Sequence, residues 1–205
     1  MSTYLQMQQR IADDLDRTDL SSQIQKAITR AIKHYSRKRF WFNETTGTFS
    51  TVADQEWYSS IPTDIKEIDD AIITVSTNRQ YPLDRRTNGY INTINWGGNA
   101  WTGYPQDYAY FKDQIRLYPV PNDAYTITLF YQQEFAELSA DADTNAWTTD
   151  AEDLIEARAR WWLYKRIIRD FDEAREAKEE EAEALDILEE ETVRQTSTGR
   201  IRPDH

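Results

Sequence analysis

Residues 114–133 read QIRLYPVPNDAYTITLFYQQ, and this stretch predicts two β-strands separated by a turn. Ile115 and Leu117 fall on one face of the first strand, because successive strand residues point to opposite sides. Residues 119–123, PVPND, are expected to end strand pairing, since proline has no N–H to donate. The return strand alternates again, and one of its faces carries Tyr125, Ile127, Leu129 and Tyr131. β-branched and aromatic residues at this density are typical of a half-buried sheet.

Glycine and proline divide the chain into three regions. Neither occurs in residues 1–46 or 122–198, whereas five of the six prolines and five of the six glycines lie within residues 47–121. This distribution predicts an α+β fold, in which N- and C-terminal helices form a helical bundle and an antiparallel β region is inserted between them in sequence. The expected parts are N-terminal helices (1–46), a β region with a Trp/Gly loop (47–135), C-terminal helices that pack with the first ones (136–195) and an extended tail (196–205).

Capping motifs predict where the helices begin. Thr3 and Gln6 form a capping box for the first helix, and residues 18–19 offer a cap for the second. Thr149 and Glu152 form a second capping box, which is expected to open the C-terminal helix.

An apolar stripe follows along the C-terminal helix, up to an expected break at residues 170–172. Its members are Leu154, Ala157, Trp161, Tyr164, Ile168 and Phe171. We expect this stripe to pack against the second helix. The expected contacts join Trp161, Ile168 and Phe171 to Ile24, Ile28 and Tyr35.

Composition excludes several classes of site. The chain has no cysteine and only two histidines, His34 and His205, so we expect no disulfide, no metal site and no cofactor. No apolar run approaches about 20 residues, which predicts that nothing spans a membrane. The first ten residues lack the layout of a signal peptide, so a soluble protein made in the cytoplasm is expected.

The acidic charge is concentrated near the C-terminus. The net charge is −12, and residues 170–191 alone carry twelve acidic and two basic residues, a local −10. This balance disfavours a protein that grips phosphates. The acidic helix contains Glu179, Glu180, Glu181 and Glu183. These side chains form either an ordinary solvated face or a surface that repels DNA, so that DNA slides past.

Basic residues gather instead on the second predicted helix. Lys26, Arg30, Lys33 and Arg37 are spaced by four, three and four residues, and no acidic residue occurs in residues 26–39. Three interpretations stay open for this face. It could contact nucleic acid, pair with the acidic helix of the same or a neighbouring subunit, or be solvated.

The sequence offers no catalytic site. The carboxylate pairs Asp13–Asp14 and Asp69–Asp70 are sequence neighbours, which point to different sides of a helix or strand and so cannot form an acid–base dyad. Gly97–Gly98 lacks the lysine and the strand-to-helix setting of a phosphate-binding loop.

Several motifs, taken in order, resemble the head–tail adaptor (connector) proteins of tailed bacteriophages, best known in short-tailed phages. They are RKRFWF (37–42) at a helix end, YSSIPTD (58–64), YPL (81–83), GYPQDYA (103–109), IRLYPVP (115–121) and NAW (145–147). The resemblance covers about residues 24–171. The chain departs from the family in the Trp/Gly loop and in the long acidic C-terminus, so contacts made there cannot be carried over.

The resemblance implies a structural virion protein rather than an enzyme. It implies a twelve-fold ring in the neck, docked under the portal protein and joined to a tail or nozzle protein, with DNA passing through the lumen unread. Two alternatives remain. One is a monomeric module that binds a peptide or glycan through a loop containing Trp96, Gly97, Gly98 and Trp101. The other, a cell-wall hydrolase, follows only from some relatives of the family.

The tail is the first candidate for the contact with the portal or an adjacent subunit. Its composition buries too little apolar surface to order a free chain. In an extended chain Arg200 and Arg202 project to one side, where they could meet a row of carboxylates, and Ile201 points to the other. The hypothesis therefore includes Arg200, Ile201, Arg202 and Asp204 as interface residues.

Overall fold

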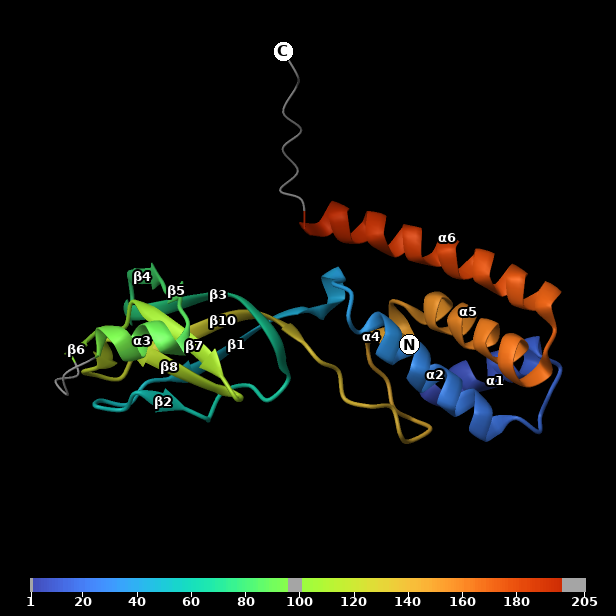
Figure 1. Ribbon diagram of the computed structural model, residues 1–205, viewed down its shortest axis with the longest axis horizontal. Helices are drawn as coiled ribbons and strands as arrows, with labels where there is room; N and C mark the ends of the chain where they lie inside the picture. The colour runs from blue at the N-terminus through green and yellow to red at the C-terminus, as the bar shows by residue number, and fades with distance from the viewer. Residues whose placement is uncertain (1, 96–100, 197–205) are drawn as a thin grey trace, which may run out of the picture. The chain divides into compact units, whose positions relative to one another are not determined.

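The computed structural model describes residues 2–95 and 101–196, and its backbone divides into two compact units. One unit joins Met1–Asn43 to Phe135–His205, and the other is Glu44–Glu134. The first is helical and the second is built mainly of strands (Figure 1). The predicted α+β class is therefore confirmed. Of the expected tail, only Thr196 belongs to the described residues, and it ends a helix.

The helical unit is formed by both ends of the chain. Its described elements are α1 (Tyr4–Asp14), α2 (Ser21–Tyr35), the short 3-10 turn η1 (Trp41–Asn43), α4 (Ala146–Thr149), α5 (Glu152–Leu163), the π-helical turn η2 (Tyr164–Ile168) and α6 (Phe171–Thr196). Helix α5 lies between α2 and α6 and contacts both (Figure 1). The expected pairing of the second helix with the C-terminal helix is thus confirmed.

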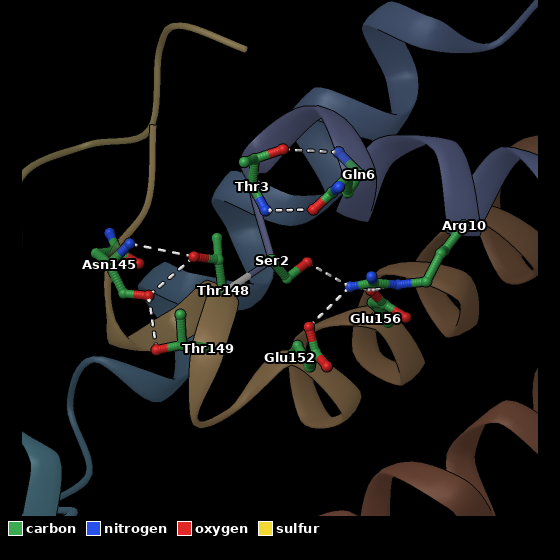
Figure 2. Close-up of polar contacts among 9 residues, drawn as sticks. All are labelled: Ser2, Thr3, Gln6, Arg10, Asn145, Thr148, Thr149, Glu152 and Glu156. Atoms are coloured by element: carbon green, nitrogen blue, oxygen red, sulfur yellow. Dashed lines mark hydrogen bonds and ion pairs between the residues drawn. The ribbon is translucent and has the colours of Figure 1, made fainter. Parts of the chain in front are cut away.

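The first helix begins at the predicted capping box. The Thr3 hydroxyl accepts a hydrogen bond from the Gln6 N–H at 3.3 Å, and the Gln6 side chain accepts one from the Thr3 N–H at 3.0 Å (Figure 2). The second helix differs from expectation, since neither residue 18 nor residue 19 caps it. Leu20 takes the cap position without a side-chain bond, and Asp19 pairs with Arg17 at 2.7 Å instead.

The predicted capping box of Thr149 and Glu152 is wrong. Thr149 is already helical, because α4 precedes α5 and the buried Trp147 lies within α4. Asn145 caps α4 by accepting from the Trp147 N–H at 3.0 Å. The hydroxyls of Thr148 and Thr149 donate to the Asn145 backbone carbonyl at 2.9 and 3.4 Å (Figure 2). Helix α5 then starts after Ala151 with no side-chain cap.

Arg10 ties α1 to the start of α5, a contact that the sequence did not predict. Its guanidinium donates to Glu156 at 2.7 Å, and to both Glu152 and Ser2 at 2.8 Å (Figure 2). Burial raises the pKa of the Glu156 carboxyl, while Arg10 opposes that rise. The ion pair therefore offsets the cost of keeping this carboxylate charged in a buried position.

The helical core is built around Trp147, which is 1% exposed. Its ring meets Phe40 and Phe42 edge-on, with centroid distances of 6.0 and 5.3 Å. Helix α2 contributes Ile24, Ala27, Ile28, Ala31 and Tyr35, and α5 contributes Leu154, Ile155, Ala159 and Leu163.

The stripe predicted for the C-terminal helix is wrong at two positions. Phe171 is 69% exposed, and Trp161 is only partly buried, whereas Ile168 does pack against the helical core. One reason is that α5 is covered by both α2 and α6, so its buried surface is wider than one stripe. The other is the break after η2, because Phe171 begins a new helix and does not continue the stripe of α5. The chain breaks as expected before α6, with Arg169 in the left-handed region at φ 64°.

Among its described residues, the strand unit contains two four-stranded sheets and a two-stranded one. The first has the order β1 (Glu44–Ser50), β10 (Thr126–Gln133), β3 (Ile65–Ser76) and β4 (Arg79–Pro82), all antiparallel. The second has the order β2 (Trp57–Tyr58), β8 (Gln114–Tyr118), β7 (Asp107–Phe111) and β5 (Asp84–Arg85). The last pairs β6 (Thr102–Gly103) in parallel with β9 (Val120–Pro121), and α3 (Asn88–Ile94) is the unit's helix among the described residues.

The stretch 114–133 forms the two predicted strands, β8 and β10, which lie in different sheets, and a short third strand, β9, lies between them in sequence. Ile115 and Leu117 of β8, like Ile127 and Leu129 of β10, are 0% exposed, so the predicted inward faces are confirmed. The expected stop in pairing at the prolines is wrong. Val120 lies between them and donates its own N–H to the Trp101 carbonyl at 2.9 Å, which allows β9 to pair with β6.

The buried face of α2 yields a first test. Replacing Ile28, which is 0% exposed, with Ala should lower the free energy of unfolding by roughly 2–5 kcal/mol, because a cavity forms in the helical core. Chemical denaturation measures this. Lys33→Ala on the exposed side of α2 is the matched control and should change it by less than about 0.5 kcal/mol. Equal stability of the two variants would contradict this packing.

Arg10 yields a second test, on pH. In Arg10→Met the buried Glu156 loses its cation, so at neutral pH a charged carboxylate is left in a costly environment. A carboxyl whose folded-state pKa is raised favours the folded protein once it is protonated, so the destabilisation should shrink as pH falls into the acidic range. Denaturant curves at neutral and acidic pH measure this. Arg17→Met removes an exposed pair and should have a small effect at both; a pH-independent loss in Arg10→Met would be the contrary result.

Candidate assembly surfaces

Two of the predicted contact regions lie largely outside the described residues. These are the tail residues Arg200, Ile201, Arg202 and Asp204, and the loop residues Trp96, Gly97 and Gly98. Trp101, at the far end of that loop, is described and is 66% exposed. Its carbonyl accepts from the Val120 N–H, so the backbone at Trp101 is fixed while its indole faces solvent.

Two exposed tyrosines add to the aromatic surface of the strand unit. Tyr81 on β4 and Tyr104 after β6 stack with a centroid distance of 5.6 Å and an interplanar angle of 22°. They are 40% and 42% exposed. Exposed aromatic side chains supply contact area at low entropic cost, so these residues and Trp101 form a candidate binding surface.

A buried arginine holds α3, the helix that precedes the loop. Arg116 on β8 is 6% exposed and donates to Glu56 at 2.7 Å. It also donates to the side-chain carbonyls of Asn88 and Asn92, which are one helical turn apart on α3. Sequence reasoning placed residue 116 only as an alternating strand position. The asparagines at spacing four were the signal that could have indicated a shared partner.

The basic face is solvent-exposed in the structure. Lys26, Arg30 and Lys33 lie on α2, and Arg37 lies in the turn after it. Within the described part of the chain, none of these four forms an ion pair with a carboxylate. Arg30 stacks over the Trp162 ring of α5 at 4.7 Å. The interpretation in which this face pairs with the acidic helix of its own subunit therefore fails for these residues, although their neighbour Lys38 does bind Glu189 at 2.6 Å.

The four predicted acidic residues behave differently from one another. Glu179 and Glu183 are exposed, and Glu180 pairs with Arg160 at 2.6 Å. Glu181 is 1% exposed, so the solvated-face interpretation is wrong for it. The reason is the phase of α6, which turns Glu181 inward together with Ala174 and Ala177.

Glu181 is the centre of a buried polar cluster. It accepts hydrogen bonds from the Tyr35 hydroxyl of α2 and from Arg158 of α5, the latter at 3.0 Å. Lys178, one turn earlier on α6, approaches it at 2.9 Å. Burial, followed by the bond to Glu181, raises the pKa of Tyr35 above its ordinary value, so its hydroxyl stays a donor. One carboxylate thus joins three helices.

Cations surround the neighbouring Trp161. Arg158, Lys165 and Lys178 lie over its ring at 4.4, 4.7 and 5.6 Å from the centroid. A partly exposed tryptophan over which three cations lie is stabilised by its ring quadrupole rather than by burial alone. These cation contacts account for the partly exposed position of Trp161, which the sequence pattern had predicted to lie in the helical core.

The described residues contain no group of three or more His, Asp or Glu side chains placed to hold a metal ion. None of the helices in residues 2–95 and 101–196 is long and apolar enough to cross a bilayer.

A family model described as SU10 adaptor protein matches residues 2–204, nearly the whole chain. The chain belongs to the SU10 adaptor family. This is consistent with a phage head–tail adaptor, as the motifs predicted. A comparison with curated proteins gives no match. As an SU10 adaptor the chain is a structural protein of the phage virion, and its exposed surfaces are candidate contacts with other virion proteins.

The Glu181 cluster yields a third test. Tyr35→Phe and Glu181→Gln should each lower the free energy of unfolding by roughly 1–3 kcal/mol, because each weakens hydrogen bonding in a buried cluster. The double variant should lose less than the sum, since the two side chains share one bond. Denaturation of all three variants measures the coupling. Glu183→Gln, on the exposed side of α6, is the control; strictly additive losses would mean that Tyr35 and Glu181 do not interact.

Proposed function

We propose that this SU10 adaptor forms a ring that docks under the portal and joins the capsid to the tail, with the genome passing through its lumen. The observation that carries the proposal is the family match over residues 2–204. The ring would be twelve-fold, like the portal, and would lie in the virion neck after synthesis in the host cytoplasm. Its partners would be the portal protein, further copies of itself and a tail or nozzle protein.

The surface charge supports a passive role toward DNA. Residues 170–191 carry a local charge of −10, and most of these acids lie on the exposed sides of α6. Like charge repels phosphates, so a lumen lined by such a helix would let duplex DNA slide without binding it. DNA is therefore proposed only as the transiting genome, with no sequence-specific contact.

A non-enzymatic role accompanies this proposal. The carboxylate pairs Asp13–Asp14 and Asp69–Asp70 have neither the spacing nor a neighbouring histidine for acid–base chemistry. Glu181, the described acidic side chain that is most deeply buried, is occupied by Tyr35 and Arg158. This supports a scaffold rather than a hydrolase.

Two surfaces are proposed for docking to neighbouring virion proteins. The tail, with Arg200, Ile201, Arg202 and Asp204, follows α6 in sequence and, as an extended chain, would offer two like charges on one side. The loop that contains Trp96, Gly97, Gly98 and Trp101 is the second. The exposed Trp101, with the Tyr81–Tyr104 stack in the same unit, also favours a second candidate function, namely a monomeric module that binds a peptide or glycan.

The adaptor proposal yields a fourth test. The full chain should co-sediment with portal-bearing heads, and electron micrographs of those particles should show an added ring. Deleting residues 196–205 should leave the melting temperature nearly unchanged and weaken docking, because the tail contributes interface contacts and little to the core.

Trp101→Ala is the matched variant on the other surface. If docking is lost in Trp101→Ala but kept in the truncated chain, the interface lies in the loop. A full-length chain that stays monomeric, fails to bind heads and still binds a peptide or glycan would replace the adaptor proposal with the binding-module alternative.

A further inference from the structure

Two stripes of opposite charge on this chain have the same spacing. The basic stripe, Lys26, Arg30, Lys33 and Arg37, is spaced by four, three and four residues. An acidic stripe on α6, formed by Glu179, Glu183, Asp186 and Glu190, is spaced by four, three and four as well. On a helix this spacing makes a straight row on one face, about 16 Å long. Lys26, Arg30 and Lys33 lie on α2, and Arg37 follows in the turn after it.

Both stripes face solvent, and the members that lie on α2 and α6 are on the side of the helix opposite the core. The buried positions of α2 include Ile24 and Ile28, and the basic positions fall about half a turn away from them. The buried positions of α6 are Ala174, Ala177, Glu181 and Leu188, and all four members of the acidic stripe are exposed. The rows are therefore exposed on different helices of one unit.

The members of both stripes lack ionic partners within the described residues, although other charges nearby have them. Glu180, Glu181 and Glu189 pair with Arg160, Arg158 and Lys38. The acids that α6 turns toward its own subunit are thus matched, whereas those it turns outward are not. The same contrast holds at the end of α2, between the paired Lys38 and the unpaired Arg37.

Apolar side chains flank the acidic stripe. Ile187 and Val193 are 58% and 65% exposed, which is high for β-branched residues on a packed helix. Ile187 also lines a groove of about 350 Å³ between α6 and the start of α5, next to Glu183 and Glu191. A partner helix lying on this face would cover apolar surface as well as neutralise charge.

We propose that the acidic stripe of α6 in one copy of the chain receives the basic stripe of α2 in the next copy. The contact uses two different surfaces, so it is heterologous, and repetition of such a contact closes into a ring when the rotation permits. The proposal deepens the ring function proposed above and rests on it. It specifies which helices meet, and it explains how chains of net charge −12 associate despite mutual repulsion.

Charge reversal tests the contact. The central residues of the two stripes face each other whether the helices run parallel or antiparallel, because the spacing reads the same in both directions. Arg30→Glu with Lys33→Glu makes one variant, and Glu183→Lys with Asp186→Lys makes the other. Each alone should weaken self-association at least about tenfold, as measured by analytical ultracentrifugation at low salt.

An equimolar mixture of the two variants should restore assembly. In it, the native basic stripe of one variant meets the native acidic stripe of the other, and the two reversed stripes also match. Glu67→Lys with Glu137→Lys is the control for the acidic variant; it makes the same change in net charge at two exposed positions and should assemble like the original chain. Melting temperatures of all variants verify folding.

The absence of cysteine permits a second measurement. A Lys26→Cys chain mixed with a Glu190→Cys chain should form an intermolecular disulfide if the helices are antiparallel, and with a Glu179→Cys chain if they are parallel. Cross-linking in neither mixture, assembly of the reversed variants at full strength, or loss of assembly with only the basic variant would overturn the inference. A chain that stays monomeric at low salt would also overturn it, yet binding of that monomer to portal-bearing heads would leave the adaptor function standing.

Discussion

The buried carboxylate of Glu181 fixes the most distinctive part of the helical unit. Helix α6 buries only two alanines and one leucine besides this residue, so apolar packing alone holds it weakly. The bonds from Tyr35 and Arg158 fix its rotation about its own axis. Once Glu181 points inward, the helical repeat turns the stripe from Glu179 to Glu190 outward. An internal ion pair therefore determines which charges the subunit presents to others.

A second constraint is that the strand unit is inserted in sequence into a helical unit. The two ends of the chain complete that helical unit together. Strand β10 lies between β1 and β3 in the first sheet. Strand β1 begins where the chain enters the strand unit, and β10 ends just before the chain leaves it. Its inward residues Ile127 and Leu129 are fully buried, so the register of the first sheet follows from this strand. The exposed Tyr81 lies on β4, which pairs with β3 of this sheet.

Sequence reasoning succeeded where one local rule decided the outcome. The Thr3 capping box, the buried faces of residues 114–133 and the apolar face of α2 each depend on neighbours a few residues apart. It failed where tertiary contacts decided. Residues 146–149, with the buried Trp147, form a separate helix, and the break at Arg169 places Phe171 at the start of another helix. Glu181 and Arg116 are buried because partners distant in sequence satisfy them. Whether a charged side chain is buried cannot be predicted from that residue alone when its partner lies more than 140 residues away in sequence, as Tyr35 does from Glu181.

The charge distribution bears on how strongly the proposed contact between copies can bind. Exposed ion pairs contribute little each, about 0–1 kcal/mol, so a single pair between subunits would not hold a ring. In a row of four ion pairs the small contributions sum. Other registers are disfavoured because like charges would then face each other, and the contact remains sensitive to salt. Such a contact suits identical copies that must associate in one arrangement. The apolar Ile187 and Val193 beside the row then supply the salt-independent part of the binding. The exposed acids Asp172, Glu173 and Glu176, which lie outside the row, stay free to repel a passing phosphate backbone.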